Sequence, residues 1–157
     1  MTSSGEVANL VYVGSAGGNR GTLRTRLSDH HDSGGWQTAF RRKVFQYVLG
    51  ILQQPRQNDV YRGTLKHART QITRQMESHF AFRCLATEDF RDFEIWLIKK
   101  YTDQLWNKQK YMMTAIEGDL STLESQLLGS PLIPFSQFDQ HISSVPDEPG
   151  VYMITKV

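Results

Sequence analysis

Three short segments rich in β-branched and aromatic residues most constrain what this chain can fold into. They lie at 7–13, 80–86 and 149–155, and their composition favours β-strands. Much of the remaining sequence has apolar residues three and four positions apart, which indicates helices. Because three short strands make only a small sheet, and 157 residues are typical of one domain, we predict a single α/β domain over residues 1–157, with helices flanking the sheet.

Helix boundaries can be placed from capping residues and breakers. Thr22 is a suitable N-cap, Pro55 follows the second apolar stripe, and Gly129 closes the last one. The residues from Ser130 to Pro134 are typical of a loop. We therefore expect helices over 22–32, 36–51, 65–76, 88–106 and 119–128.

Several classes of protein are disfavoured by composition. The sequence has no run of 18 apolar residues and no charged and apolar leader at its start, so we expect neither a membrane span nor a signal peptide, and a cytoplasmic protein. The one cysteine, Cys84, cannot form an internal disulfide, and its spacing from His67 and His79 matches no familiar zinc motif. The glycine-rich loop over 17–21 lacks the Lys-Ser/Thr ending of a phosphate-binding loop.

Charge is distributed unevenly along the chain. The net charge is +2, but residues 20–83 carry twelve Lys/Arg and four acids, while 111–155 carry six acids and no Lys or Arg. A basic helical region of this kind is typical of a surface that binds a polyanion, although solvated helix faces can give the same pattern. The candidate phosphate contacts are Arg20, Arg41, Arg42, Lys43, Lys66, Arg69 and Arg74.

A carboxylate interrupts the apolar stripe of the predicted helix over 88–106. At about 100° per residue, Glu94 falls between Phe90, Phe93, Leu97 and Ile98. Burial of an unpaired charge is costly, so Glu94 must be neutral, meet a cation or line a cleft.

The first predicted helix has a matching irregularity. Arg26 lies between Leu23 and Leu27 on the apolar face, and His30 follows one turn later. A simple ion pair between Arg26 and Glu94 would account for both irregularities without any further function.

These residues occur within a wider set of motifs. Tyr12-Val13-Gly14, then Arg26 with His30 four residues later, then Glu94, and finally Asn107 together resemble the GIY-YIG nuclease superfamily, nearest in style to its restriction and homing endonucleases. In that family a Gly-Ile-Tyr strand precedes the Tyr-Ile-Gly strand. Here the matching segment, Gly150-Val151-Tyr152, comes last.

The chain therefore resembles a circularly permuted member of that family, opened at the turn of its first hairpin. Residues 112–148 would be an acidic connector that leads back to the final strand. The alternative is a segment of a longer chain that carries a second, truncated copy.

The resemblance implies a small, mainly antiparallel sheet and a catalytic site. Glu94 would hold Mg²⁺ or Mn²⁺, and Arg26 would bind a phosphate oxygen. Tyr12 is the favoured phenol for activating water, with Tyr152 in the same cleft. His30 would accept a proton or bind phosphate, and Asn107 would orient a strand or helix end. Without the family, the same side chains are ordinary strand aromatics and helix caps.

The expected function is metal-dependent endonucleolytic cleavage of DNA, with structured or single-stranded nucleic acid as a further possible substrate, by a monomer or homodimer. A nucleic-acid-binding module that keeps the fold but does not cut is the second hypothesis. A structural protein in which Arg26 and Glu94 pair is the third.

Overall fold

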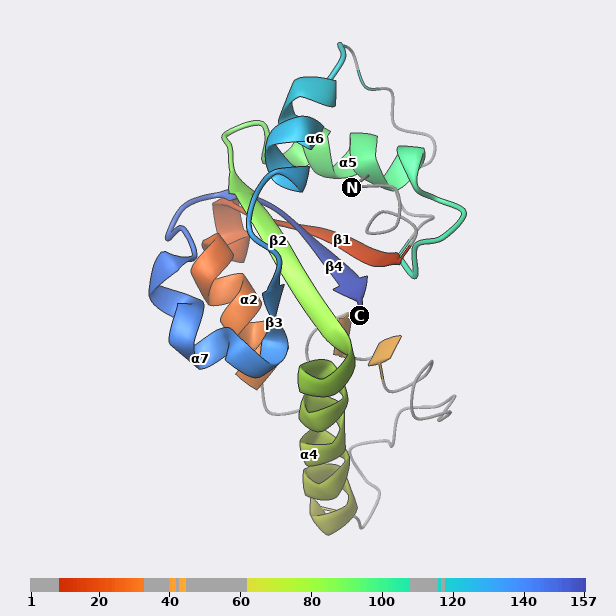
Figure 1. Cartoon of the computed structure of the whole chain (residues 1–157), viewed down its shortest axis with the longest axis vertical. Coiled ribbons are helices and arrows are strands. Elements are labelled where there is room, and N and C mark those ends of the chain that lie inside the picture. The colour runs from red at the N-terminus through yellow and green to blue at the C-terminus, as the bar shows by residue number, and fades with distance from the viewer. Residues whose placement is uncertain (1–8, 33–39, 42, 45–61, 108–115, 117) are drawn as a thin grey trace.

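A four-stranded antiparallel sheet forms the centre of the protein. The computed structural model describes residues 9–32, 40–41, 43–44, 62–107, 116 and 118–157. The strand order is β1 (Leu10–Ala16), β4 (Gly150–Lys156), β2 (Phe80–Ala86) and β3 (Ile133–Pro134), and every neighbouring pair is antiparallel (Figure 1). The predicted α/β class with a small antiparallel sheet is confirmed.

Helices cover both faces of this sheet. The face that we call the α2 face packs against α2 (Leu23–Asp32), α4 (Arg62–His79) and α7 (Phe138–His141). The opposite face, which we call the α5 face, packs against α5 (Phe90–Lys100) and α6 (Ser121–Leu128). Figure 1 shows the two groups of helices on opposite sides of β4. Short 3₁₀ turns complete the described elements: η1 (Gly18–Arg20), η2 (Phe135–Gln137) and η3 (Ile142–Ser144).

The first and last strands of the chain pair along their whole length. Leu10 lies opposite Thr155, Ala16 lies opposite Gly150, and the Lys156 amide donates to the Asn9 carbonyl at 2.9 Å. The expectation that the two tyrosine-bearing segments form neighbouring strands is confirmed. β4 is fully flanked by β1 and β2, and six of its seven residues are buried.

The segment just before β4 is fixed to the start of α2. Thr22 Oγ1 accepts a bond from the Thr25 amide at 3.3 Å, as expected of an N-cap. The amides of Leu23 and Arg24 donate to the carbonyls of Glu148 and Pro146 at 2.9 and 3.1 Å.

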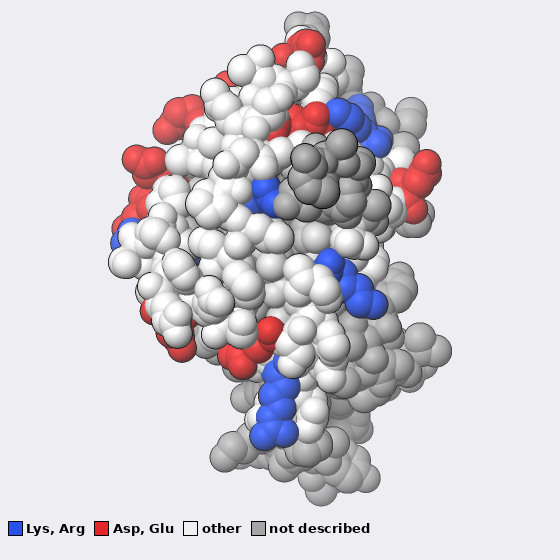
Figure 2. Space-filling model, viewed as in Figure 1, with Lys and Arg blue, Asp and Glu red and all other residues white. Residues whose placement is uncertain are grey.

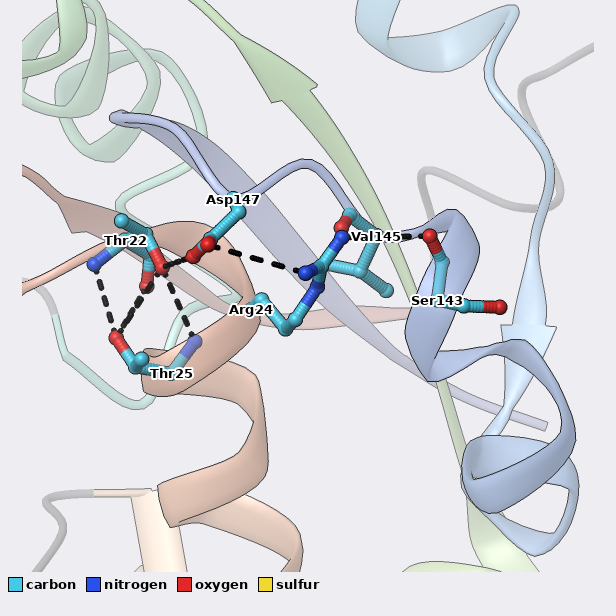
Figure 3. A network of polar contacts seen from close by, with 6 residues as sticks. All are labelled: Thr22, Arg24, Thr25, Ser143, Val145 and Asp147. Carbon is cyan, nitrogen blue, oxygen red and sulfur yellow. Dashed lines mark hydrogen bonds and ion pairs between the residues drawn. The ribbon is translucent and has the colours of Figure 1, made fainter.

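Side chains reinforce this junction (Figure 3). Thr22 donates to Asp147 at 2.6 Å, and Arg24 Nε and Nη2 donate to the carbonyls of Val145 and Ser143. The contacts satisfy amides that a helix start leaves free, and they set the position of β4 relative to α2.

Some predicted boundaries are wrong. The helix expected over 88–106 ends at Lys100, because the chain turns and then runs along β1, where the Trp106 amide donates to the Val11 carbonyl at 2.8 Å. The loop expected over 130–134 contains β3, in which Pro134 occupies an edge strand, where a missing amide is tolerated. Of the helix expected over 36–51, residues 40, 41, 43 and 44 are helical and the others lie outside the described residues. Among the described helices, none combines the length and the apolar character needed to cross a bilayer.

Candidate active site at the edge of β1

The two motif tyrosines lie side by side on the α2 face. Tyr12 lies opposite Ile154 in the β1–β4 register and Gly14 lies opposite Tyr152, so both rings project from the same side of the sheet. Their centroids are 6.3 Å apart with nearly parallel planes. The phenol of Tyr152 lies over Gly14, where any Cβ would collide with it. Glycine at this position therefore allows the Tyr152 ring to extend over β1.

His30 of α2 contacts the Tyr152 hydroxyl directly. The distance from His30 Nε2 to Tyr152 Oη is 2.5 Å, and the imidazole is fully buried. Burial lowers the pKa of His30 well below its usual value, and the charges of Arg26 and Arg41 lower it further. His30 is therefore neutral at pH 7. The sequence favoured Tyr12 as the reactive phenol, whereas the contact with His30 favours Tyr152.

Arg26 lies one helical turn before His30 and is half-buried. Its Nε atom is buried and has no hydrogen-bond partner among the described residues. Burial raises the pKa of Tyr152 well above its usual value, and the Tyr12 and Glu94 charges add to this rise. The charge and hydrogen bond of Arg26 act in the opposite direction. Arg26 is thus the group that favours a phenolate at Tyr152.

Glu94 approaches β1 from the opposite side of the sheet. It lies on α5 with a relative exposure of 6%, as the interrupted apolar stripe predicts. Glu94 Oε1 is 3.7 Å from Arg20 Nη1, and that same nitrogen is 3.5 Å from Ser15 Oγ. Tyr12, Tyr152, His30 and Arg26 lie on the α2 face, so the structure places the predicted site residues in two groups, one on each face of the sheet.

An open pocket of about 380 Å³ lies beside Glu94. The sequence predicted Arg20 and Glu94 in this region but missed Ser15 and Arg91. Two signals could have identified them, since Ser15 directly follows Gly14 and Arg91 lies three residues before Glu94, on the same face of a helix. The lining residues are Ser15, Gly17, Asn19, Arg20, Phe90, Arg91, Glu94 and Ile95.

Asn107 fixes the backbone of β1 next to the site. Its Nδ2 donates to the Val13 carbonyl at 2.5 Å, and its Oδ1 accepts from the Val13 amide at 3.4 Å. Gln104 and Trp106 make similar bonds to Leu10 and Val11. These contacts cover the outer edge of β1 up to Val13, immediately before Gly14. Asn107 therefore orients a strand, one of the two roles predicted for it.

The donor set at the pocket fits a hard divalent cation held by a single carboxylate. No group of three or more His, Cys, Asp or Glu suitable for a metal occurs in the described part of the chain. Glu94 offers carboxylate oxygens, and the Ser15 hydroxyl and Asn19 amide line the same pocket. Mg²⁺ is commonly bound through one or two carboxylates and keeps several waters, so Glu94 fits this role, with the cationic side chains of Arg20 and Arg91 lining the same pocket.

The predicted phosphate contacts have different environments. Arg41 differs from the expectation: its exposure is 1% and its guanidinium bonds to other parts of the protein, so we remove it from the set. Arg20 and Arg74 are exposed and Lys43 is half-buried. Arg42 and the side chains of Lys66 and Arg69 lie outside the description. On the face shown in Figure 2, the described Lys and Arg side chains form separate patches.

Comparisons of this chain with protein-family models, with curated protein sequences and with solved structures gave no match. The function proposed below therefore depends on the fold and the geometry of the site.

Proposed function

We propose that this protein is a divalent-metal-dependent endonuclease that hydrolyses phosphodiester bonds in DNA, with a circularly permuted GIY-YIG-like arrangement. One observation carries the proposal. The Tyr152 phenol is held by His30 beside Arg26 on the α2 face, and Glu94 is buried on the α5 face beside Ser15 of the same strand, β1. Clusters of buried ionisable groups with perturbed pKa values are concentrated at functional sites.

Arg26 is the group placed to receive the phosphate. It is half-buried, whereas Tyr12, Tyr152 and His30 are all at most 5% exposed. A phosphate would therefore approach from the side of Arg26, whose planar guanidinium matches two phosphate oxygens.

Tyr152 and His30 are placed to take the proton of the attacking water. As the water oxygen bonds to phosphorus and the bond from phosphorus to the leaving sugar oxygen breaks, the water's proton passes to Tyr152 Oη and the phenol proton passes to His30 Nε2 across the 2.5 Å contact. The leaving sugar oxygen takes up a proton from solvent water. The neutral His30 has a ring nitrogen that can accept that proton, and burial and the charges of Arg26 and Arg41, which lower the pKa of His30, oppose this transfer. The charge of Arg26 favours the phenolate that forms in this exchange.

Glu94 is the residue that would hold the metal ion. When bound there, Mg²⁺ or Mn²⁺ would neutralise charge that develops on the phosphate oxygens. Arg20, 3.7 Å from Glu94, is exposed and could turn toward a bound phosphate.

The strand pairing supports the permuted arrangement. The start of β1 and the end of β4 are hydrogen-bonded neighbours through Asn9 and Lys156. A connection between those two points would form the hairpin in which the family's two tyrosine motifs follow each other.

Plasmid nicking tests the proposal. Supercoiled plasmid is incubated with the full chain, with and without Mg²⁺ or Mn²⁺, and with Glu94→Gln. Asp92→Asn is the matched control, because Asp92 is an exposed acid on the same helix. We expect metal-dependent nicking that Glu94→Gln loses and Asp92→Asn keeps.

A different result would support the second hypothesis, a module that binds nucleic acid without cutting it. Retardation of DNA without cutting by wild type would support a nucleic-acid-binding module, which the basic stretch over 20–83 would suffice to form. If the protein neither cuts nor retards DNA, the nuclease proposal is overturned.

A further inference from the structure

Arg41 is one of the largest fully buried side chains of the described residues, although its sequence context predicted a surface position. Its relative exposure is 1%. Arg41 Nη1 donates to the carbonyls of His30 and His31 at 3.0 and 2.9 Å, and Nη2 donates to Thr73 Oγ1 of α4 at 3.1 Å. The guanidinium therefore joins the end of α2 to the middle of α4.

The carbonyls that Arg41 binds belong to the last turn of α2, which ends at Asp32. Carbonyls in a final helical turn lack partners within the helix and carry the negative end of its dipole. A buried cation that donates to two of them is a strong cap because the bonds are charge-assisted. Arg41 thus fixes the backbone at the point where α2 ends.

His30 connects this cap to the candidate active site. Its carbonyl accepts from Arg41, and its imidazole contacts the Tyr152 hydroxyl. We propose that Arg41 is a positioning residue of the site, which holds the end of α2 so that the His30 ring stays on Tyr152. This proposal rests on the nuclease function proposed above.

The charge of Arg41 has a second effect on the same ring. His30 is faced by Arg26 from its own helix, by Tyr12 and Tyr152 from the sheet, and by Arg41, while Glu77 of α4 bonds to the neighbouring His31 at 3.0 Å. Arg41 lowers the pKa of His30 and so helps to keep it neutral. Removal of the Arg41 charge should therefore raise the pKa of His30.

The α5 face offers a matched control. Arg83 is 4% exposed and donates through Nη1 to the carbonyls of Leu128 and Ser130, at the end of α6. It lies opposite Met153 in the register, whereas its neighbour Cys84 lies opposite Tyr152. Arg83 therefore caps a helix in the same way but on the face away from His30.

The test combines NMR with kinetics on the full chain carrying Arg41→Met, Arg41→Lys or Arg83→Met. The His30 ring signals are assigned with His30→Gln and titrated with pH. We expect Arg41→Met to raise the pKa of His30, Arg41→Lys to leave it near the wild-type value because the charge remains, and Arg83→Met to leave it unchanged. The melting temperature of each variant shows how far the substitution destabilises the fold, so that a loss of activity through unfolding can be recognised.

Nicking rates complete the test. Because small misplacements of reacting groups can cost about 100-fold, we expect Arg41→Met to lower kcat about 10- to 100-fold with KM unchanged. Arg41→Lys should lower kcat less than Arg41→Met does. Arg83→Met should keep the wild-type rate at temperatures where it is folded. If Arg41→Met does not fold, the test depends on Arg41→Lys. This variant must then lower kcat several-fold and change the chemical shifts of the His30 ring, even though its pKa stays near the wild-type value.

The proposal is overturned if Arg41→Met leaves the pKa of His30 unchanged, or if Arg83→Met lowers kcat as much as the Arg41 variants. It is also overturned if Arg41→Lys matches wild type in rate and ring signals when Arg41→Met cannot be studied. If wild type does not nick DNA, the nuclease function fails instead, and the His30 titration still decides whether Arg41 controls that ring.

Discussion

The α5 face and the α2 face of the sheet both bury polar groups but satisfy them differently. On the α5 face, Glu124 accepts bonds from Lys100 Nζ at 2.6 Å and Tyr101 Oη at 2.5 Å. On the α2 face, His30 Nδ1 and Arg26 Nε are buried with no hydrogen-bond partner in the described residues.

An unsatisfied buried polar group costs about 1–3 kcal/mol, so stability alone favours the arrangement of the α5 face. Such exceptions in a folded protein call for an explanation, such as a catalytic role or a bound water or ion. The His30 and Arg26 side chains lie beside Tyr152, whereas Glu94 lies on the α5 face. In the proposed function, Tyr152, His30 and Arg26 of the α2 face take the proton and the phosphate, and Glu94 of the α5 face holds the metal ion.

Substitution of Gly14 should give the largest loss of stability. Gly14→Ala places a methyl group against the Tyr152 phenol, and overpacking of this kind costs about 1–3 kcal/mol. Ser15→Ala is the control, because Ser15 lies next along β1 and lines the pocket on the other face. Urea unfolding should show a clear loss for Gly14→Ala and less than about 1 kcal/mol for Ser15→Ala. Equal losses would mean that Tyr152 does not depend on a glycine there.

Acid should destabilise the protein mainly through the α2 face. The pKa of His30 is lowered in the folded state, so His30 contributes stability that is present above its unfolded pKa, near 6.5, and is lost as pH falls below it. The loss is at most about 1.4 kcal/mol per pH unit. Unfolding free energies of wild type and His30→Gln should therefore converge between pH 7 and 5. Parallel curves would contradict a buried neutral His30.

Alkali should destabilise both faces of the sheet, and the effect should be smaller for Tyr101 on the α5 face than for Tyr152 on the α2 face. Burial and the bond to Glu124 raise the pKa of Tyr101, so its contribution to stability is present below pH 10 and is lost above it. Tyr101→Phe should cost about 1 kcal/mol at pH 7 and should weaken the loss of stability between pH 9 and 11. Thermal melts over that range measure both effects. An unchanged alkaline slope would show that folding does not raise the pKa of Tyr101.

Much of the core of the site could be predicted from sequence. Glu94 violates the period of an apolar helix, and periodicity is a local property that needs no knowledge of the fold. The strands of Tyr12 and Tyr152 were predicted from composition, and their pairing is confirmed. Membership of the nuclease family, the metal ion and the DNA substrate stay predictions.

The remainder depends on how elements meet in space. Arg41 was predicted on a solvent-exposed face because its own helix has no signal that α2 ends beside it. The two residues of β3 are too few for any pattern and pair only because β2 has a free edge. The end of α5 at Lys100 reflects the pairing of Trp106 with β1, which is remote in sequence.

The central claim is that Tyr152 and Glu94, from opposite sides of the sheet, act on one reaction at the edge of β1. A kinetic double-mutant cycle with Tyr152→Phe, Glu94→Asp and the double variant tests it in the plasmid assay. Residues that act as a unit are strongly non-additive, so the account predicts that each single variant lowers the nicking rate at least about 100-fold and that the double variant is little worse. Losses that multiply in the double variant, or a Tyr152→Phe variant that nicks at the wild-type rate, would contradict the account.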